Sequence, residues 1–512
     1  MSQKFITING KDLTIETSVK IVTENYSIKV AKSCIPKIKA SRRLIDKWIN
    51  QNEAVYGITT GFGEFKDVRI STENIDKLQR NLILSHAAGV GKYIPDNIAR
   101  LMMLFRINSL IQGYSGVRLE LIEFLVEYFN NGLIPLIPSQ GSVGSSGDLS
   151  PLAHMSLSFI GEGYTKCDGE ILESSVALRR CSIEPIILKA KEGLALINGT
   201  QMMTAYMCWS LYEASRMSKL ADVSGALSLD ALRGSVAPFD KKIHNARPHK
   251  GQADTAKNLL SLLKGSEINT SHSDCGKVQD AYSLRCMPQV HGAVKDTINY
   301  CRNIIETEMN SVTDNPLIFS EQGVQIPGGN FHGEPVAFAA DFLAIAVSEL
   351  GSICERRIAR ILDGSLSGLP RFLVKEGGLN SGLMIAQYTA AALASENKSL
   401  SHPASVDSIP TSANQEDHNS MGSIGSRQAF DVINNVKKII AIEFLCACQG
   451  LDFLEPLKTG KGTGTAYELF RGQIAFINND VNVSNLINSS LAVIFTPTFL
   501  EKVERSSGKL IC

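Results

Sequence analysis

Residues 335–362 read PVAFAADFLAIAVSELGSICERRIARIL, and this stretch predicts the fold. Apolar residues would lie on most faces of a helix through it, with Asp341 and Glu349 interrupting the run. At about 1.5 Å per residue the helix would be roughly 40 Å long. The two carboxylates argue against a membrane span. We therefore expect a long helix that is largely buried in a bundle.

Similar apolar patterns recur along the chain. We expect further helices over residues 97–112, 117–130, 199–227 and 426–449. Several long helices that are apolar on most faces indicate a large bundle with surfaces buried between subunits. The predicted fold class is mainly α: an elongated bundle of long helices with a smaller mixed N-terminal part.

The N-terminal part has a different pattern, because helical periodicity begins only near Cys34. Before it, segments 4–8 and 13–17 alternate in polarity around Asn9-Gly10, which predicts a β-hairpin. We place a soft boundary near residue 110. It separates a mixed α/β part, 1–110, from a helical body, 111–512.

Composition excludes several classes of function. The 512 residues include 51 Lys plus Arg and 51 Asp plus Glu, so no net field recruits nucleic acid. The N-terminus lacks the apolar stretch of a signal peptide, so we expect a cytoplasmic protein. The 11 cysteines are scattered, with Cys446 and Cys448 the closest pair, and we interpret them as reduced thiols. Neither a metal nor a nucleotide motif is present, so we expect neither cofactor.

Residues 141–154 read GSVGSSGDLSPLAH and contain the triplet Ser145-Ser146-Gly147. Because Gly147 has no side chain, its amide nitrogen can reach the carbonyl carbon of Ser145. Cyclisation there, with loss of one water from the ring and one from Ser146, gives a methylidene-imidazolone. That group is an electrophile. The alternative interpretation is an ordinary flexible Gly/Ser loop.

The residues after the triplet favour the chemical interpretation. Ser150 is a good N-cap, and Pro151 suits the first helical position. The loop would then lie against a helix N-terminus, whose partial positive charge strengthens a neighbouring electrophile.

Short segments rich in glycine and asparagine, here called knots, interrupt the helical pattern at five further places. Taken singly, each has a structural explanation: Tyr56 as a core tyrosine, Arg285 paired with a structural carboxylate, His86 as a satisfied core residue. Together they favour a site, because irregular polar segments are costly to bury without a purpose. The knots are residues 55–63, 84–91, 196–201, 278–285 and 412–418.

These motifs and residues 141–154 resemble, in the same order, the aromatic amino acid lyases that use a methylidene-imidazolone. The resemblance runs from about Val55 to about Arg427. Ser85-His86 and the segment Asn414 to His418 resemble the members of the family that act on histidine. One departure is Ser145, where the family usually has Ala. Only the carbonyl carbon of that residue enters the ring, so we expect its small side chain to be tolerated.

The resemblance implies a role for each matching residue. Ser145, Ser146 and Gly147 would form the prosthetic ring autocatalytically, Tyr56 would be the catalytic base, and Arg285 would hold the substrate carboxylate. His86 and Glu416 would recognise the imidazole. The remaining residues implied to line the pocket are Asn198, Gln279, Tyr282 and Phe331.

The resemblance also implies a reaction and an assembly. The reaction is the non-oxidative elimination of ammonia from L-histidine to give trans-urocanate, the first step of histidine degradation. Whether the electrophile takes up the substrate amine or attacks the aromatic carbon stays open. The assembly is a homotetramer with active sites shared between subunits, without metal, nucleotide, nucleic acid or membrane.

Three alternatives compete with this interpretation. The first is a tyrosine or phenylalanine ammonia-lyase, or a 2,3-aminomutase, of the same family. His86 and Glu416 argue against it, and the Glu416 carboxylate can pair with an imidazole but gains nothing from a phenyl ring. The second is a serine hydrolase, but the sequence lacks Gly-x-Ser-x-Gly. The third is a non-catalytic homologue, which has little reason to keep Tyr56, Arg285 and Glu416 together.

Overall fold

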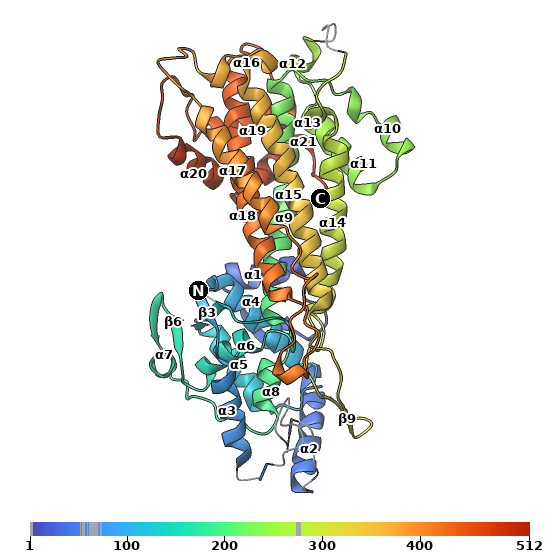
Figure 1. The fold of residues 1–512 in the computed structure, drawn as a ribbon, viewed down its shortest axis with the longest axis vertical. Helices are drawn as coiled ribbons and strands as arrows, with labels where there is room; N and C mark the ends of the chain where they lie inside the picture. Colours follow the sequence, from blue (N-terminus) through green and yellow to red (C-terminus); the bar gives the residue numbers. More distant parts are fainter. Residues whose placement is uncertain are drawn as a thin grey trace. The chain divides into compact units, whose positions relative to one another are not determined.

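The fold of the protein, as a computed structural model, is mainly helical, which confirms the predicted class (Figure 1). The structure describes residues 4–51, 53, 57–58, 60, 70–71, 74–272 and 278–512. Within those residues lie 21 α-helices and nine short strands. The strands form small sheets of two or three strands each.

Contacts divide the chain into two compact units whose segments alternate along the sequence. Unit 1 comprises 1–212, 301–341 and 403–427, and unit 2 comprises 213–300, 342–402 and 428–512. Four of the five limits between the units fall inside long helices, and the fifth, at 402/403, follows α17 (Met384–Leu400). The four helices are α9 (Gln201–Ala231), α14 (Met287–Glu308), α15 (Glu334–Leu362) and α18 (Gly422–Asp452). Residue 110 lies inside unit 1, and a separately folding 1–110 part stays a prediction.

Unit 1 combines short helices with all nine strands of the described chain. Its helices are α1 (Ile15–Thr23), α2 (Ile35–Asn50), α3 (Ile75–His86), α4 (Asp96–Leu110), α5 (Leu119–Asn130), α6 (Leu149–Phe159), α7 (Ser174–Arg180) and α8 (Glu192–Ile197). Its strands are β1 (Phe5–Ile8), β2 (Ser27–Val30), β3 (Val90–Tyr93), β4 (Ile134–Pro135), β5 (Pro138–Gln140), β6 (Tyr164–Cys167), β7 (Glu170–Glu173), β8 (Leu317–Phe319) and β9 (Val324–Ile326).

The predicted N-terminal hairpin is wrong. Residues 15–23 form the helix α1, and β1 pairs in parallel with β2, Phe5 facing Ser27. The Thr14 side chain accepts a hydrogen bond from the Thr17 amide and caps the helix. A parallel pair needs a crossover connection, which α1 provides. Residues 13–17 were predicted as a strand from their alternating polarity, but they lead into a helix.

The five expected long helices are confirmed as α4, α5, α9, α15 and α18. By length and composition α15 is apolar enough to cross a membrane, but 61% of its most apolar window is buried inside the protein. The core helix of a globular protein passes the same test. This burial agrees with the bundle interpretation of residues 335–362.

Unit 2 is built on long helices that run side by side (Figure 1). Arg357 of α15 and Glu443 of α18 form a fully buried ion pair. Ser224 and Ser228 of α9 donate hydrogen bonds to the same carboxylate, which satisfies its remaining lone pairs. The other helices of the unit are α10 (Lys241–Ala246), α11 (Lys250–Leu262), α12 (Glu267–Thr270), α13 (Tyr282–Arg285), α16 (Gly364–Ser367), α17 (Met384–Leu400), α19 (Lys461–Arg471), α20 (Val483–Ile494) and α21 (Pro497–Ser507).

The ten cysteines that the structure describes are free thiols, and most of them are buried. Burial raises the pKa of the Cys448 thiol to about 12, so it stays protonated and inert at neutral pH. In the described part of the chain, no group of three His, Cys, Asp or Glu side chains is arranged to hold a metal ion.

Candidate active site

The triplet Ser145-Ser146-Gly147 lies in the loop between β5 and α6, where the backbone is compressed. Gly147 has a φ of +75°, a left-handed conformation that favours glycine. A Cβ atom at this position would lie 2.1 Å from the carbonyl oxygen of Gly199, so a larger residue does not fit. Asp148 donates its amide to the same oxygen at 2.7 Å. The loop is therefore a tightly held turn rather than a flexible linker.

Asp148 is a buried anchor at the end of the loop. Its carboxylate accepts hydrogen bonds from the amides of Met202 and Met203, in the first turn of α9, at 2.8 and 3.0 Å. The Ser423 hydroxyl donates to it at 2.8 Å. Burial raises the pKa of Asp148 to about 6, and these hydrogen bonds oppose the rise. The carboxylate thus joins the loop to the N-terminus of a second helix.

Serine hydroxyls fasten the other side of the loop. The Ser142 hydroxyl donates to the carbonyl oxygen of Gly147 at 3.2 Å, and the Ser423 hydroxyl donates to Ser142 at 2.7 Å. Ser420 donates its hydroxyl to the Gly144 carbonyl at 3.2 Å. The segment 420–423 therefore holds the loop in addition to α9.

The helix after the loop begins two residues earlier than predicted. α6 starts at Leu149 with Asp148 at the cap position, so Ser150 lies in the first turn and is not the N-cap. The Asp148 carboxylate accepts hydrogen bonds from the amides of α9, while the backbone of the same residue leads into α6. The expected juxtaposition of the triplet with a helix N-terminus holds despite this shift.

Ser146 faces Glu416 across the loop. The Ser146 hydroxyl donates to Oε1 of Glu416 at 3.2 Å, although the two residues are 270 positions apart. Oε2 of the same carboxylate accepts a hydrogen bond from the Thr411 hydroxyl at 2.9 Å. Thr411 and Glu416 also pair through their backbones as an isolated antiparallel bridge. The carboxylate is thereby oriented toward the triplet.

The backbone before Glu416 is strained. Ser412, Ala413 and Asn414 all have φ values of +52° to +67°. Consecutive non-glycine residues in the left-handed region each cost on the order of 1–3 kcal/mol, and such strain concentrates at functional sites. The segment needs contacts on both sides to keep this conformation.

His86 lies at the C-terminal end of α3, half-buried. Burial lowers its pKa, while a backbone hydrogen bond to Leu82 and the negative charge of Glu416 raise it. His86 belongs to unit 1, as Glu416 does. Ser85 and His86 are also within hydrogen-bond distance, with 3.0 Å between the hydroxyl and Nδ1.

Asn198 is buried just before α9. Its Nδ2 donates to the carbonyl of Asn315 at 3.1 Å, while its Oδ1 is buried with no hydrogen-bond partner in the described chain. Arg106, which the sequence did not single out, donates to the Asn198 carbonyl at 3.1 Å. Burial lowers the pKa of Arg106 to about 10, so this guanidinium stays charged. An orphaned acceptor beside the loop is open to a ligand.

Phe331 lies in the turn before α15 and is half-buried. Two residues on, a Cβ atom at Gly333 would lie 2.9 Å from the Ser420 hydroxyl. The Phe331 turn therefore packs beside the segment that holds the triplet loop.

Three expected substrate residues belong to unit 2, whereas the triplet lies in unit 1. Gln279 and Tyr282 are exposed, and the Arg285 guanidinium stacks on the Tyr282 ring at 4.4 Å. In the described chain Nε of Arg285 is buried without a hydrogen-bond partner. Their meeting with the triplet at one site stays a prediction. Tyr56, the expected base, lies outside the described residues.

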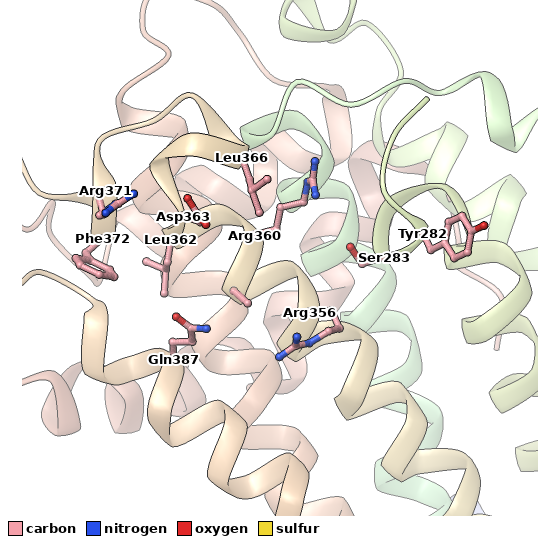
Figure 2. A pocket seen from close by; sticks show the side chains of 11 residues that line it. Tyr282, Ser283, Arg356, Arg360, Leu362, Asp363, Leu366, Arg371, Phe372 and Gln387 are labelled. Carbon is pink, nitrogen blue, oxygen red and sulfur yellow. The ribbon is translucent and has the colours of Figure 1, made fainter. Parts of the chain in front are cut away.

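Tyr282 also lines a pocket of about 650 Å³ in unit 2 (Figure 2). Arg356, Arg360 and Arg371 surround this pocket, with Asp363 as its acidic residue. The surface around Tyr282 is therefore rich in positive charge, which suits an anionic group such as a carboxylate.

The residues that secure the loop were missed as functional residues. Asp148 directly follows the triplet, and Ser420 and Ser423 follow Glu416 by only a few positions. Closeness in sequence to the triplet and to Glu416 was the only feature from which their role could have been predicted. A single Asp or Ser carries no pattern until its partners are known.

The residues around the triplet fit a prosthetic ring made from it. Only glycine fits at position 147, the turn is compressed against Gly199, and the buried Ser145 side chain is small. Oδ1 of Asn198 has no hydrogen-bond partner among the described residues, and Ser146 points at a carboxylate. The fold thus presents an enclosed, polar loop on a helical scaffold.

Comparison with known proteins identifies the class that this fold and loop define. The family model of the aromatic amino acid lyases matches residues 13–472. The chain belongs to this family, which confirms the resemblance seen in the sequence.

Individual relatives are similar over nearly their whole length. Histidine ammonia-lyase of Alkaliphilus oremlandii is 48% identical over 98% of this chain and 99% of its own. The structure of histidine ammonia-lyase from Trypanosoma cruzi is 43% identical with a TM-score of 0.92, covering 98% of this chain and 95% of that one. Tyrosine aminomutase from Streptomyces globisporus is 38% identical with a TM-score of 0.94, covering 99% and 100%.

Proposed function

We propose that this protein eliminates ammonia from L-histidine to give trans-urocanate and ammonia. The observation that carries the proposal is the contact between the Ser146 hydroxyl and Glu416. The triplet thus lies beside a carboxylate that can pair with an imidazole. The names of the relatives, histidine ammonia-lyases at 43–48% identity, support the same substrate.

In this proposal Glu416 and His86 bind the imidazole of the substrate. Glu416 is held by Thr411 and can accept a hydrogen bond from a ring N–H. A ligand without that N–H would leave the carboxylate unpaired, which can cost roughly 10⁴-fold in kcat/KM. This argument disfavours phenylalanine as a substrate.

Other residues orient the substrate and move its proton. Arg285, with an unpartnered Nε in the described chain, would hold the carboxylate, and Asn198 offers its free Oδ1 to the amine. Tyr56 would take the β-proton, while the Cα–N bond breaks and the electron pair leaves with the nitrogen. Gln279, Tyr282 and Phe331 would line the pocket. A methylidene-imidazolone formed from Ser145-Ser146-Gly147 would supply the electrophilic carbon that makes this elimination possible.

A tyrosine or phenylalanine aminomutase is the second candidate, because the Streptomyces globisporus tyrosine aminomutase shares the fold at 38% identity. The histidine enzymes are more similar in sequence, at 43–48%. The proposed pairing of Glu416 with an imidazole favours histidine ammonia-lyase over the aminomutase.

The proposed assembly is a cytoplasmic homotetramer with sites shared between subunits. Support comes from apolar side chains that a single chain exposes in unit 2. Phe342 and Ile345 of α15 are 44% and 48% exposed, and Ile385 and Tyr388 of α17 are 54% and 65% exposed. Burial of these side chains between copies of the chain would remove them from water.

The test is turnover of purified protein with L-histidine, L-tyrosine and L-phenylalanine, followed by the absorbance of a conjugated acid. We expect product from histidine alone. In parallel, the intact mass should lack two waters, located by peptide mapping to residues 141–154. A full mass, or preferred turnover of tyrosine, would overturn the proposal.

A further inference from the structure

His332 joins two segments of unit 1 through both nitrogens of its ring. Nε2 lies 3.2 Å from the backbone carbonyl oxygen of His418, and Nδ1 lies 3.3 Å from the backbone nitrogen of Glu334. A carbonyl only accepts and an amide only donates. Both bonds therefore form only in the neutral tautomer with hydrogen on Nε2, which donates to His418 while Nδ1 accepts from Glu334. We call this pair of bonds the His332 bridge.

The two imidazole rings also stack. The His332 and His418 ring centroids are 5.9 Å apart with an interplanar angle of 8°. The Glu334 carboxylate lies 3.9 Å from Nδ1 of His332 and 4.0 Å from Nε2 of His418. Its Oε2 is buried and has no hydrogen-bond partner in the described chain. The ring positions are thus determined by stacking as well as by the bridge.

The bridge connects residues expected to contact the substrate. On one side His332 follows Phe331 directly, and Glu334 is the first residue of α15. On the other side the His418 carbonyl lies two residues after Glu416. The two bridged positions are 86 residues apart in sequence. The bridge therefore determines how the Glu416 segment lies against the turn that carries Phe331.

The Glu416 segment is attached on both sides. Thr411 donates to the Glu416 carboxylate on the near side. On the far side the Asn419 backbone amide donates to the Ser408 hydroxyl at 2.9 Å, and Nδ2 of Asn419 donates to the carbonyl oxygens of Ile409 and Glu416. Asp417 and His418 are exposed between these two attachments. Since residues 412–414 are in a strained left-handed conformation, a contact at His418 limits the freedom of the whole segment.

We propose that His332 is a positioning residue for substrate recognition, which acts through the carbonyl of His418 on the carboxylate of Glu416. The inference rests on the proposed function, in which Glu416 binds the imidazole of histidine. A contact that binds substrate and transition state alike alters KM and leaves kcat nearly unchanged. Loss of the bridge should therefore appear in KM, and a purely structural role would not produce this split.

Four variants separate the bridge from the stack. His332→Ala removes both, and His332→Phe keeps an aromatic ring against His418 but has no donor. His332→Gln keeps an N–H close to the position of Nε2. His418→Ala is the matched control, because it removes the second ring and keeps the carbonyl that His332 uses.

We expect His332→Ala and His332→Phe to raise KM for L-histidine about tenfold to a hundredfold, since small displacements of a binding group have effects of this size. His332→Gln should restore KM to within about threefold of the unsubstituted protein, and His418→Ala should have a smaller effect than His332→Phe. Unchanged KM in both the Ala and Phe variants would overturn the proposal. So would a Gln variant no better than Phe.

Hydrogen exchange tests the bridge without any turnover. The amides of residues 411–420 should exchange faster in His332→Phe than in the unsubstituted protein, and His332→Gln should reverse the change. If the unsubstituted protein does not turn over histidine, the proposed function fails while this measurement still decides on the bridge. Equal exchange in all variants would refute the bridge even with an active enzyme.

Discussion

In the proposed function the chemistry depends on Ser146, because its Cβ would become the electrophilic carbon of the ring. Its hydroxyl points at Glu416 from a turn where only glycine fits at the next position. Ser145 next to it would contribute only its carbonyl carbon. The proposal therefore assigns unequal roles to two adjacent serines with similar side chains.

Substitution of these two serines tests that difference. Ser146→Ala should leave the full mass of residues 141–154 and lower turnover by at least about 10³-fold, since nucleophilic or electrophilic groups typically contribute this much. Ser145→Ala is the matched control and should keep both the two-water deficit and turnover. Mass spectrometry and a rate assay check both. A Ser146→Ala protein with most of its rate would contradict the proposed ring.

Glu416 is the residue that should select histidine. We expect Glu416→Ala to lower kcat/KM for histidine by about 10³–10⁴-fold, because the imidazole N–H loses its buried acceptor. The two-water mass deficit should remain, since the triplet and Asp148 are untouched. Steady-state kinetics and intact mass measure the two effects. Near-normal turnover would show that another group recognises the ring.

At the scale of elements, the site depends on how helix termini meet the loop. Asp148 caps the turn into α6 while its carboxylate accepts amides from the first turn of α9. A negative charge is stabilised at a helix N-terminus, and burial opposes the charge. The raised pKa of about 6 shows that burial is the larger effect.

This raised pKa predicts a pH dependence of stability. The pKa of Asp148 is about 6 in the fold and about 3.9 in an unfolded chain. The folded state holds the proton more tightly, so this contribution to stability is complete below about pH 4 and is lost as pH rises through 6.

The contribution of Asp148 protonation to the free energy of unfolding is on the order of 2–3 kcal/mol. Asp148→Asn should remove it, and urea unfolding from pH 4 to 7 measures the difference between the two proteins. Parallel curves for both would contradict the assignment to Asp148.

The elements also show the limits of local patterns. The helices α4, α9, α15 and α18 could be predicted because apolar residues recur at helical spacing over many residues in each of them. The short segment 13–17 was too brief to distinguish a strand from the start of α1, so the hairpin prediction failed. Parallel pairing of β1 with β2 needs residues that are not neighbours in sequence.

At the scale of the whole molecule, the expected site residues fall into two units. Ser146, His86, Asn198, Phe331 and Glu416 belong to unit 1, whereas Gln279, Tyr282 and Arg285 belong to unit 2. A homotetramer with shared sites would let one copy supply the loop and another supply Arg285. The exposed apolar residues of α15 and α17 are consistent with such an assembly.

Mixing two inactive variants tests shared sites. Ser146→Ala and Arg285→Ala should each lose turnover alone. Co-expressed, they should form about a quarter of intact sites if the loop and the arginine come from different subunits. The rate per site, with light scattering for the oligomeric mass, measures this. No recovery in a mixed tetramer would mean that each site comes from one chain.

Helical period and motif order are local properties of the chain, so the helical class, the triplet and the family could be predicted from the amino-acid order alone. The contacts that secure the site depend on the folded chain. Asp148 with Met202, Ser146 with Glu416, and His332 with His418 are each separated by 54 to 270 residues. Such pairs meet only when the chain folds, and the single residues carry no periodic signal that would reveal their partners beforehand.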